Sequence, residues 1–141
     1  MKILFTLKPP NGSYGGGAFF VKNMTDHLLH KGHTVCLDLV EDIDVIFMID
    51  PRKDKYNTIG LLEVMEYKKK YPNTKIIHRI NENDVKRTNS IYIEDLILKT
   101  MTIADSIVFV SQWLHDYYHK KYDLSNITAT KNVILNGVDT A

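Results

Sequence analysis

A glycine-rich segment near the N-terminus has the composition of a phosphate-binding turn. Residues 11–17 read Asn-Gly-Ser-Tyr-Gly-Gly-Gly and lie between an apolar run, Ile3–Leu7, and a helical pattern that begins near Ala18. Such a turn lets the backbone approach a ligand closely and directs free N–H groups and the positive end of the helix dipole toward an anion. The segment therefore predicts a phosphate-bearing ligand, but it identifies neither the ligand nor a reaction. A glycine turn without a ligand is the alternative.

The same glycines match a dinucleotide-binding fingerprint only in part. Gly15 and Gly17 supply its first two glycines, but Phe20 occupies the third position, where close helix–strand packing requires a small residue. Asp38 lies roughly 20 residues further on, where the fingerprint places an acidic group for a ribose hydroxyl. A dinucleotide-dependent oxidoreductase is therefore kept as an alternative.

A second group of polar side chains follows the apolar stretch 75–80. Arg79 lies inside that stretch, and a buried guanidinium is costly unless it is paired or binds an anion. Arg79 is thus a candidate ligand contact, or else it forms a structural ion pair with Asp50 or Asp84. In an extended chain, residues 79 and 81 share one side and His78 lies on the other.

Asp50 ends an earlier apolar stretch in a similar way. Its carboxylate could contact a sugar hydroxyl, or it could cap its own loop.

The histidine spacing does not predict a metal site. His115 and His119 are four residues apart on a predicted helix, but Asp116 stands where a zinc-protease helix has glutamate. No histidine follows His119 to supply a third ligand, so we expect no metal.

Composition narrows the class of protein. The 141 residues suit one domain, residues 1–141, and 44% hydrophobic with 25% charged residues is ordinary for a globular protein. A net charge of +1 and the lack of a broad basic stretch give no indication of nucleic-acid binding. The single cysteine, Cys36, lies in an apolar run and fits an inert thiol in a reducing compartment.

No targeting signal or bilayer-spanning run is visible, and we expect a cytoplasmic location. Three lysines, Lys68–Lys70, lie at the end of a predicted helix, where their positive charges interact favourably with the negative end of the helix dipole. They are interpreted as a solvated helix end, with peripheral contact with an anionic membrane as the alternative.

Short apolar runs alternate with amphipathic stretches along the whole chain. This alternation predicts an α/β fold, Rossmann-like and doubly wound, with a mostly parallel sheet and helices on both faces. The predicted strands are 2–7, 34–39, 44–49, 75–80, 106–110 and 133–135, and the predicted helices are 18–31, 58–71, 91–104 and 112–122. The gap 40–43 is too short for a parallel crossover, which predicts a misplaced strand boundary or an unusual connection.

Four segments, taken in order, resemble the N-terminal half of family 4 (GT4) retaining glycosyltransferases of the GT-B fold. The segments are Gly15–Ala18, Ile77–Asp84, Ala104–Leu114 and Val133–Asp139. The most specific part is the Ala-Asp strand that runs into Val-Ser-x-Trp, followed later by Asn-Gly-Val-Asp. The resemblance covers essentially the whole chain.

The resemblance implies two Rossmann-like domains that face each other across a cleft, and this chain corresponds to the N-terminal, acceptor-side domain. By analogy, Gly15, Gly16 and Gly17 approach the diphosphate of a nucleotide-diphosphate sugar, which is the donor substrate; no cofactor is implied. The residues that would line the acceptor-side cleft are Arg79, Asn81, Asp84, His78 and Asp50.

The donor-binding half of such an enzyme carries a Glu-x7-Glu pair, and no glutamate here has a partner eight positions on. We therefore expect a glycosyltransferase domain that acts on a glycan or small-molecule acceptor and is inactive alone. A separate C-terminal half would complete it, and a homo-oligomer is a further possible assembly. A non-catalytic phosphate- or glycan-binding module of the same fold is the alternative, and no catalytic residue is assigned.

Overall fold

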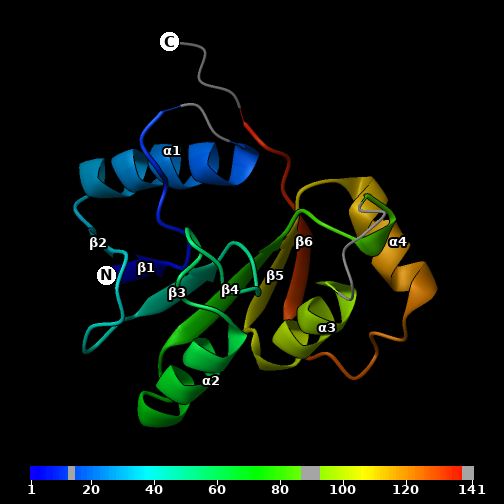
Figure 1. The fold of residues 1–141 in the computed structure, drawn as a ribbon. Helices are drawn as coiled ribbons and strands as arrows, with labels where there is room; N and C mark the ends of the chain where they lie inside the picture. The colour runs from blue at the N-terminus through cyan, green and yellow to red at the C-terminus, as the bar shows by residue number, and fades with distance from the viewer. Residues whose placement is uncertain (13–14, 87–92, 138–141) are drawn as a thin grey trace.

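A parallel β-sheet forms the centre of the protein. The computed structural model describes residues 1–12, 15–86 and 93–137 (Figure 1). Its strands are β1 (Lys2–Phe5), β2 (Thr34–Cys36), β3 (Val45–Met48), β4 (Lys75–Ile80), β5 (Ser106–Phe109) and β6 (Thr130–Val133). They form one six-stranded sheet in the order β2-β1-β3-β4-β5-β6, and every neighbouring pair is parallel. The α/β fold predicted from the alternation is confirmed.

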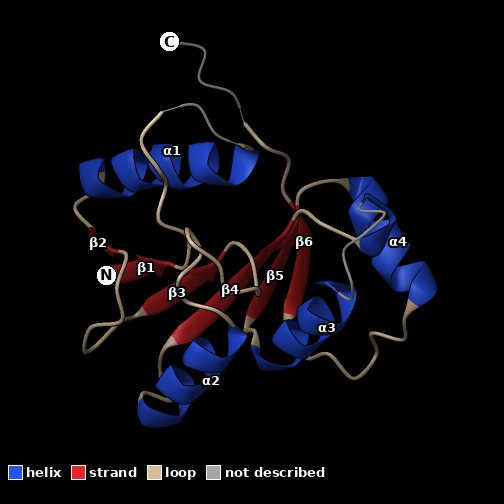
Figure 2. Ribbon diagram, in the orientation of Figure 1, coloured by secondary structure: helices blue, strands red, loops and turns tan. Residues whose placement is uncertain are grey.

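Helices cover both faces of the sheet (Figure 2). Helix α1 (Gly16–His30) lies on one face, and α2 (Leu61–Lys70), α3 (Ile93–Ile103) and α4 (Gln112–Lys121) lie on the other. Because successive side chains of a strand point to opposite faces, Ile3 and Phe5 pack with Val21 of α1, while Leu4 joins the core beneath α2 and α3. The apolar character of the strands follows from this double burial.

The structure moves several predicted boundaries. Strand β2 ends at Cys36, so residues 37–44 connect it to β3 without a helix, and β2 and β3 lie on opposite sides of β1. Strand β6 begins at Thr130, three residues before the predicted strand 133–135, because it is an edge strand whose polar residues are partly exposed. Helix α1 begins at Gly16, two residues before its predicted start.

Parts of three sequence predictions lie outside the described residues. They are residues 13–14 of the glycine segment, residues 91–92 at the start of the third predicted helix, and residues 138–139 at the end of the Val133–Asp139 segment.

A short 3-10 helix, η1 (Asp84–Lys86), follows β4. Within the described ranges, no helix has both the length and the apolar character needed to cross a membrane.

Candidate functional site

The first turn of α1 is open to an anion. In an open parallel sheet, ligands bind beyond the carboxyl ends of the strands, and α1 begins at that edge after the β1 loop. Gly15 precedes the helix with an extended backbone (φ −65°, ψ 172°), and no side chain of the described residues caps it. The first turn also contains no acidic residue. Its first N–H groups therefore lack intrahelical acceptors and carry the positive end of the helix dipole.

The fold itself does not require glycine at positions 15–17. A Cβ atom added to Gly15 or Gly16 would meet nothing within 4 Å, and one on Gly17 would make ordinary contacts with Ile49 Cγ2 at 3.4 Å and Leu7 Cδ2 at 3.6 Å. None of the three has a positive φ, whereas Gly12 has φ 112°. Glycine weakens a helix relative to alanine. Packing and backbone angles among the described residues therefore do not explain the glycines at these three positions.

A pocket of about 470 Å³ lies between α1 and the segment that follows β6. We call it the α1 pocket. Its lining combines aromatic rings, small residues and amides: Gly16, Phe19, Phe20, Asn23, Met24, Asp26, Asn136 and Gly137. Its size falls in the range of small-molecule sites.

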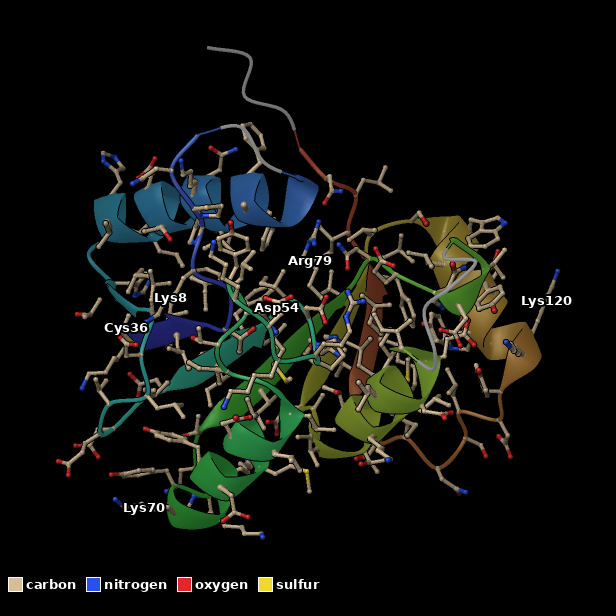
Figure 3. All side chains as sticks on the ribbon, in the orientation of Figure 1. Lys8, Cys36, Asp54, Lys70, Arg79 and Lys120 are labelled. Carbon is tan, nitrogen blue, oxygen red and sulfur yellow. The ribbon has the colours of Figure 1, made fainter. Side chains whose placement is uncertain are left out.

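Arg79 lies against this pocket and has no acidic partner among the described residues. It is only 3% exposed, and Figure 3 shows it reaching from β4 toward the N-terminal end of α1. Its Cζ atom lies 4.5 Å from the centroid of the Phe20 ring, and its Nη2 donates to Asn136 Oδ1 at 2.8 Å. Its Nη1 atom is buried and has no hydrogen-bond partner among the described residues. Burial lowers the pKa of Arg79, and no neighbouring carboxylate opposes that shift.

Asp50 is held by its own loop. Its Oδ1 accepts from the Arg52 backbone N–H at 2.8 Å and from Arg52 Nε at 2.9 Å, and its Oδ2 accepts from Arg52 Nη2 at 2.5 Å. These hydrogen bonds raise the pKa of Arg52. Asp50 is thus a loop-capping residue and forms no ion pair with Arg79.

Asp84 and Glu94 fix the other end of the loop after β4. Asp84 Oδ1 accepts from the backbone N–H groups of Ile93 (3.0 Å) and Glu94 (3.4 Å), so Asp84 caps α3. Glu94 Oε1 in turn accepts from the Asp84 N–H at 3.0 Å. Asp84 is therefore engaged in capping and forms no ion pair with Arg79.

Glu94 also ties α3 to α4. Its carboxylate accepts from Tyr117 Oη at 2.6 Å, from Lys121 Nζ at 2.8 Å and from Tyr122 Oη, although Glu94 is only 1% exposed. Burial alone would raise the pKa of Glu94, but the hydrogen bonds from Lys121, Tyr117 and Tyr122 bring it down to about 2.

His78 lies on the opposite side of the sheet from Arg79. Like Ile76 and Ile80, its side chain is buried on the face covered by α2 and α3, and it is 1% exposed. Burial lowers the pKa of its imidazole from 6.5 to about 4, and the nearby Asp50 carboxylate acts in the opposite sense. Asn81 follows β4 directly and is half-buried. Arg79, one of the five candidates for the acceptor side, contacts two residues that line the α1 pocket, Phe20 and Asn136.

The two histidines of α4 lie together on the surface of that helix. The rings of His115 and His119 stack at 4.0 Å, and His119 Nδ1 lies 2.7 Å from the His115 carbonyl oxygen. His115 Nδ1 lies 3.0 Å from Asp116 Oδ1. No group of three or more metal-ligating side chains occurs in residues 1–12, 15–86 and 93–137.

The sequence did not assign the two residues that hold Arg79. In the sequence, Phe20 argues against a dinucleotide site, and Asn136 belongs to the Val133–Asp139 segment. In the structure they contact the same guanidinium. The sequence signal at these positions is that Asn136 lies within Val133–Asp139 and that Phe20 follows Gly15–Ala18 by two positions.

No protein-family model matches this sequence, and no curated protein shows significant sequence similarity to it. Function is therefore argued from the geometry of the α1 pocket. The pocket is lined by aromatic, amide and small residues, and the Arg79 guanidinium and the start of α1 adjoin it.

Proposed function

We propose that this chain is the N-terminal, acceptor-side domain of a retaining glycosyltransferase. The complete enzyme would transfer a sugar from a nucleotide-diphosphate donor to an acceptor hydroxyl in the cytoplasm. One observation carries the proposal: three of the segments that resemble the family, far apart in the sequence, meet at the α1 pocket. They contribute Gly16 and Asn136 to its lining, and Arg79 to the wall behind Phe20.

The chemistry expected of this surface is charge stabilisation. When the bond between sugar and diphosphate breaks, negative charge develops on the leaving diphosphate. Preorganised N–H groups at the start of α1 would stabilise that charge, as fixed dipoles do in other enzymes. A second domain would bind the nucleotide and supply the catalytic groups of the donor side.

The test compares the 141-residue chain alone with the same chain joined to a donor-binding domain of the GT-B type. A panel of nucleotide-diphosphate sugars and acceptors is offered to both, and released nucleotide diphosphate is measured. We expect turnover only with both domains present. Turnover by the chain alone would refute the need for a second domain, and absence of transfer by the joined protein would favour a non-catalytic binding module.

The oxidoreductase alternative receives less support from the structure. The Phe20 ring lies 5.6 Å from the Phe47 ring and fills the space that a third glycine would leave open. Asp38 is paired with Lys8, with 2.5 Å between Oδ1 and Nζ. A thermal-shift titration with NAD and NADP separates the two functions, because stabilisation by either dinucleotide would favour the oxidoreductase.

A further inference from the structure

Arg79 lacks the partners that usually accompany a buried arginine. Removing a guanidinium from water has a large free-energy cost, which is normally offset by a carboxylate and several hydrogen bonds. Here the described partners are one neutral amide oxygen, from Asn136, and one aromatic face, from Phe20. The Nη1 atom has no hydrogen-bond partner among the described residues. The protein thus keeps a full positive charge at this position without neutralising it.

The position of this charge points to the α1 pocket. Both described contacts of the guanidinium are made with residues that line the pocket, Phe20 and Asn136. Gly16 lines the same pocket and begins α1, whose first turn has no acidic residue. Two independent sources of positive potential, a guanidinium and a helix N-terminus, therefore adjoin one cavity.

We propose that Arg79 binds a phosphoryl group in the α1 pocket and that Asn136 positions its guanidinium. This site does not depend on the transferase proposal, because the same group could be part of a nucleotide diphosphate or the monoester of a phosphorylated small molecule. In either case Nη1 donates to a phosphate oxygen while Nη2 stays on Asn136.

The shape of the site favours phosphate over other anions. A guanidinium presents its N–H groups in a fixed plane that matches two oxygens of a phosphate, and helix N-termini supply further N–H donors. Open space over Gly15 and Gly16 leaves room for the group's remaining oxygens. The acidic residue of the pocket, Asp26, lies ten positions along α1 from Gly16, which corresponds to about 15 Å of helix.

Asn136 is suited to positioning because it is neutral. Its Oδ1 holds Nη2 in place without cancelling the charge that a ligand would need. An aspartate at this position would keep the contact and neutralise Arg79. Asn136→Asp should therefore preserve or raise thermal stability while it weakens anion binding, a combination that a purely structural arginine would not show.

The experiment measures the binding of pyrophosphate and of glycerol 3-phosphate by calorimetry and by 31P NMR. Four proteins are compared: the 141-residue chain, Asn136→Asp, Arg79→Lys, and the control Lys99→Gln, which removes one positive charge from an exposed position on α3. Thermal unfolding of each protein checks its fold. We expect Asn136→Asp to weaken binding by about tenfold or more with its melting temperature unchanged or raised, and Lys99→Gln to match the wild type.

The outcomes are decisive in either direction. Preference for pyrophosphate identifies a diphosphate ligand, and preference for glycerol 3-phosphate identifies a phosphate monoester. Equal affinity of the wild type and Asn136→Asp, or no binding of either probe by the wild type, overturns the proposal. Because the assay measures binding alone, its result is independent of whether sugar transfer is ever observed.

Discussion

The buried imidazole of His78 should make the stability of the protein depend on pH in a range where its carboxylates contribute little. Its pKa is 6.5 when exposed and about 4 in the folded protein, because burial disfavours the charged ring. Between these values the unfolded chain binds a proton that the folded protein does not. Stability is therefore fully present above pH 6.5 and is lost as pH falls toward 4.

The size of the effect follows from the two pKa values. Lowering the pH from about 7.5 to about 5 should reduce the free energy of unfolding by about 2 kcal/mol through His78 alone. The stabilising carboxylate of Glu94 has a pKa of about 2, so its contribution is lost mainly at lower pH. Among the described residues, the charge of Asp50 acts on His78; it favours the protonated ring and limits the loss.

Urea unfolding followed by circular dichroism at several pH values measures this loss. A His78→Met variant fills a similar volume and cannot titrate, so its stability should fall by much less over the same range. His30→Asn, at the exposed end of α1, is the matched control and should behave as the wild type. If His78→Met and the wild type lose the same free energy, the assignment of a neutral buried imidazole is wrong.

Three further predictions follow from particular contacts. Glu94→Gln removes a buried carboxylate that joins α3, α4 and the Asp84 N–H. Urea unfolding should show that the free energy of unfolding falls by about 3 kcal/mol. A smaller fall than that caused by an exposed substitution such as Lys99→Gln would contradict this role. Ser111→Ala removes the hydroxyl that accepts from the Leu114 N–H at 3.1 Å and should cost about 1 kcal/mol in the same assay, with Ser111→Asp restoring the cap. Gly16→Ala should leave stability unchanged or raise it by up to about 1 kcal/mol, because open space surrounds the new Cβ, while calorimetry should show weaker pyrophosphate binding; unchanged binding would mean that the ligand does not approach this glycine.

The sequence predicts the fold well because the sheet is covered on both faces. Continuous apolar runs such as Val45–Ile49 can only be buried in that way, and the period of two correctly separates His78 from Arg79. The weak predictions involve polar or glycine-rich residues. Gly16 and Gly17 have low helix propensity, yet they form the first turn of α1, and the polar Thr130–Asn132 belongs to an edge strand.

The candidate site was harder to predict because its decisive contact is remote and neutral. The sequence identified Arg79 as a costly buried charge and suggested carboxylate partners, but both of those carboxylates bind local backbone groups instead. Its actual partner, Asn136, lies 57 positions away and carries no charge. Charge matching along a sequence cannot find such a pair, whereas parallel strand order brings the ends of β4 and β6 to the same edge of the sheet.

Whether the start of α1, Arg79 and Asn136 contact one phosphate-bearing ligand is tested by an NMR titration of the 141-residue chain with a nucleotide diphosphate such as UDP. We expect the amide signals of Gly16 and Gly17, the Arg79 side-chain N–H and the Asn136 side-chain amide to shift together, while signals of His115 and His119 on α4 do not. Shifts confined to other regions, or no shifts at all, would contradict this expectation.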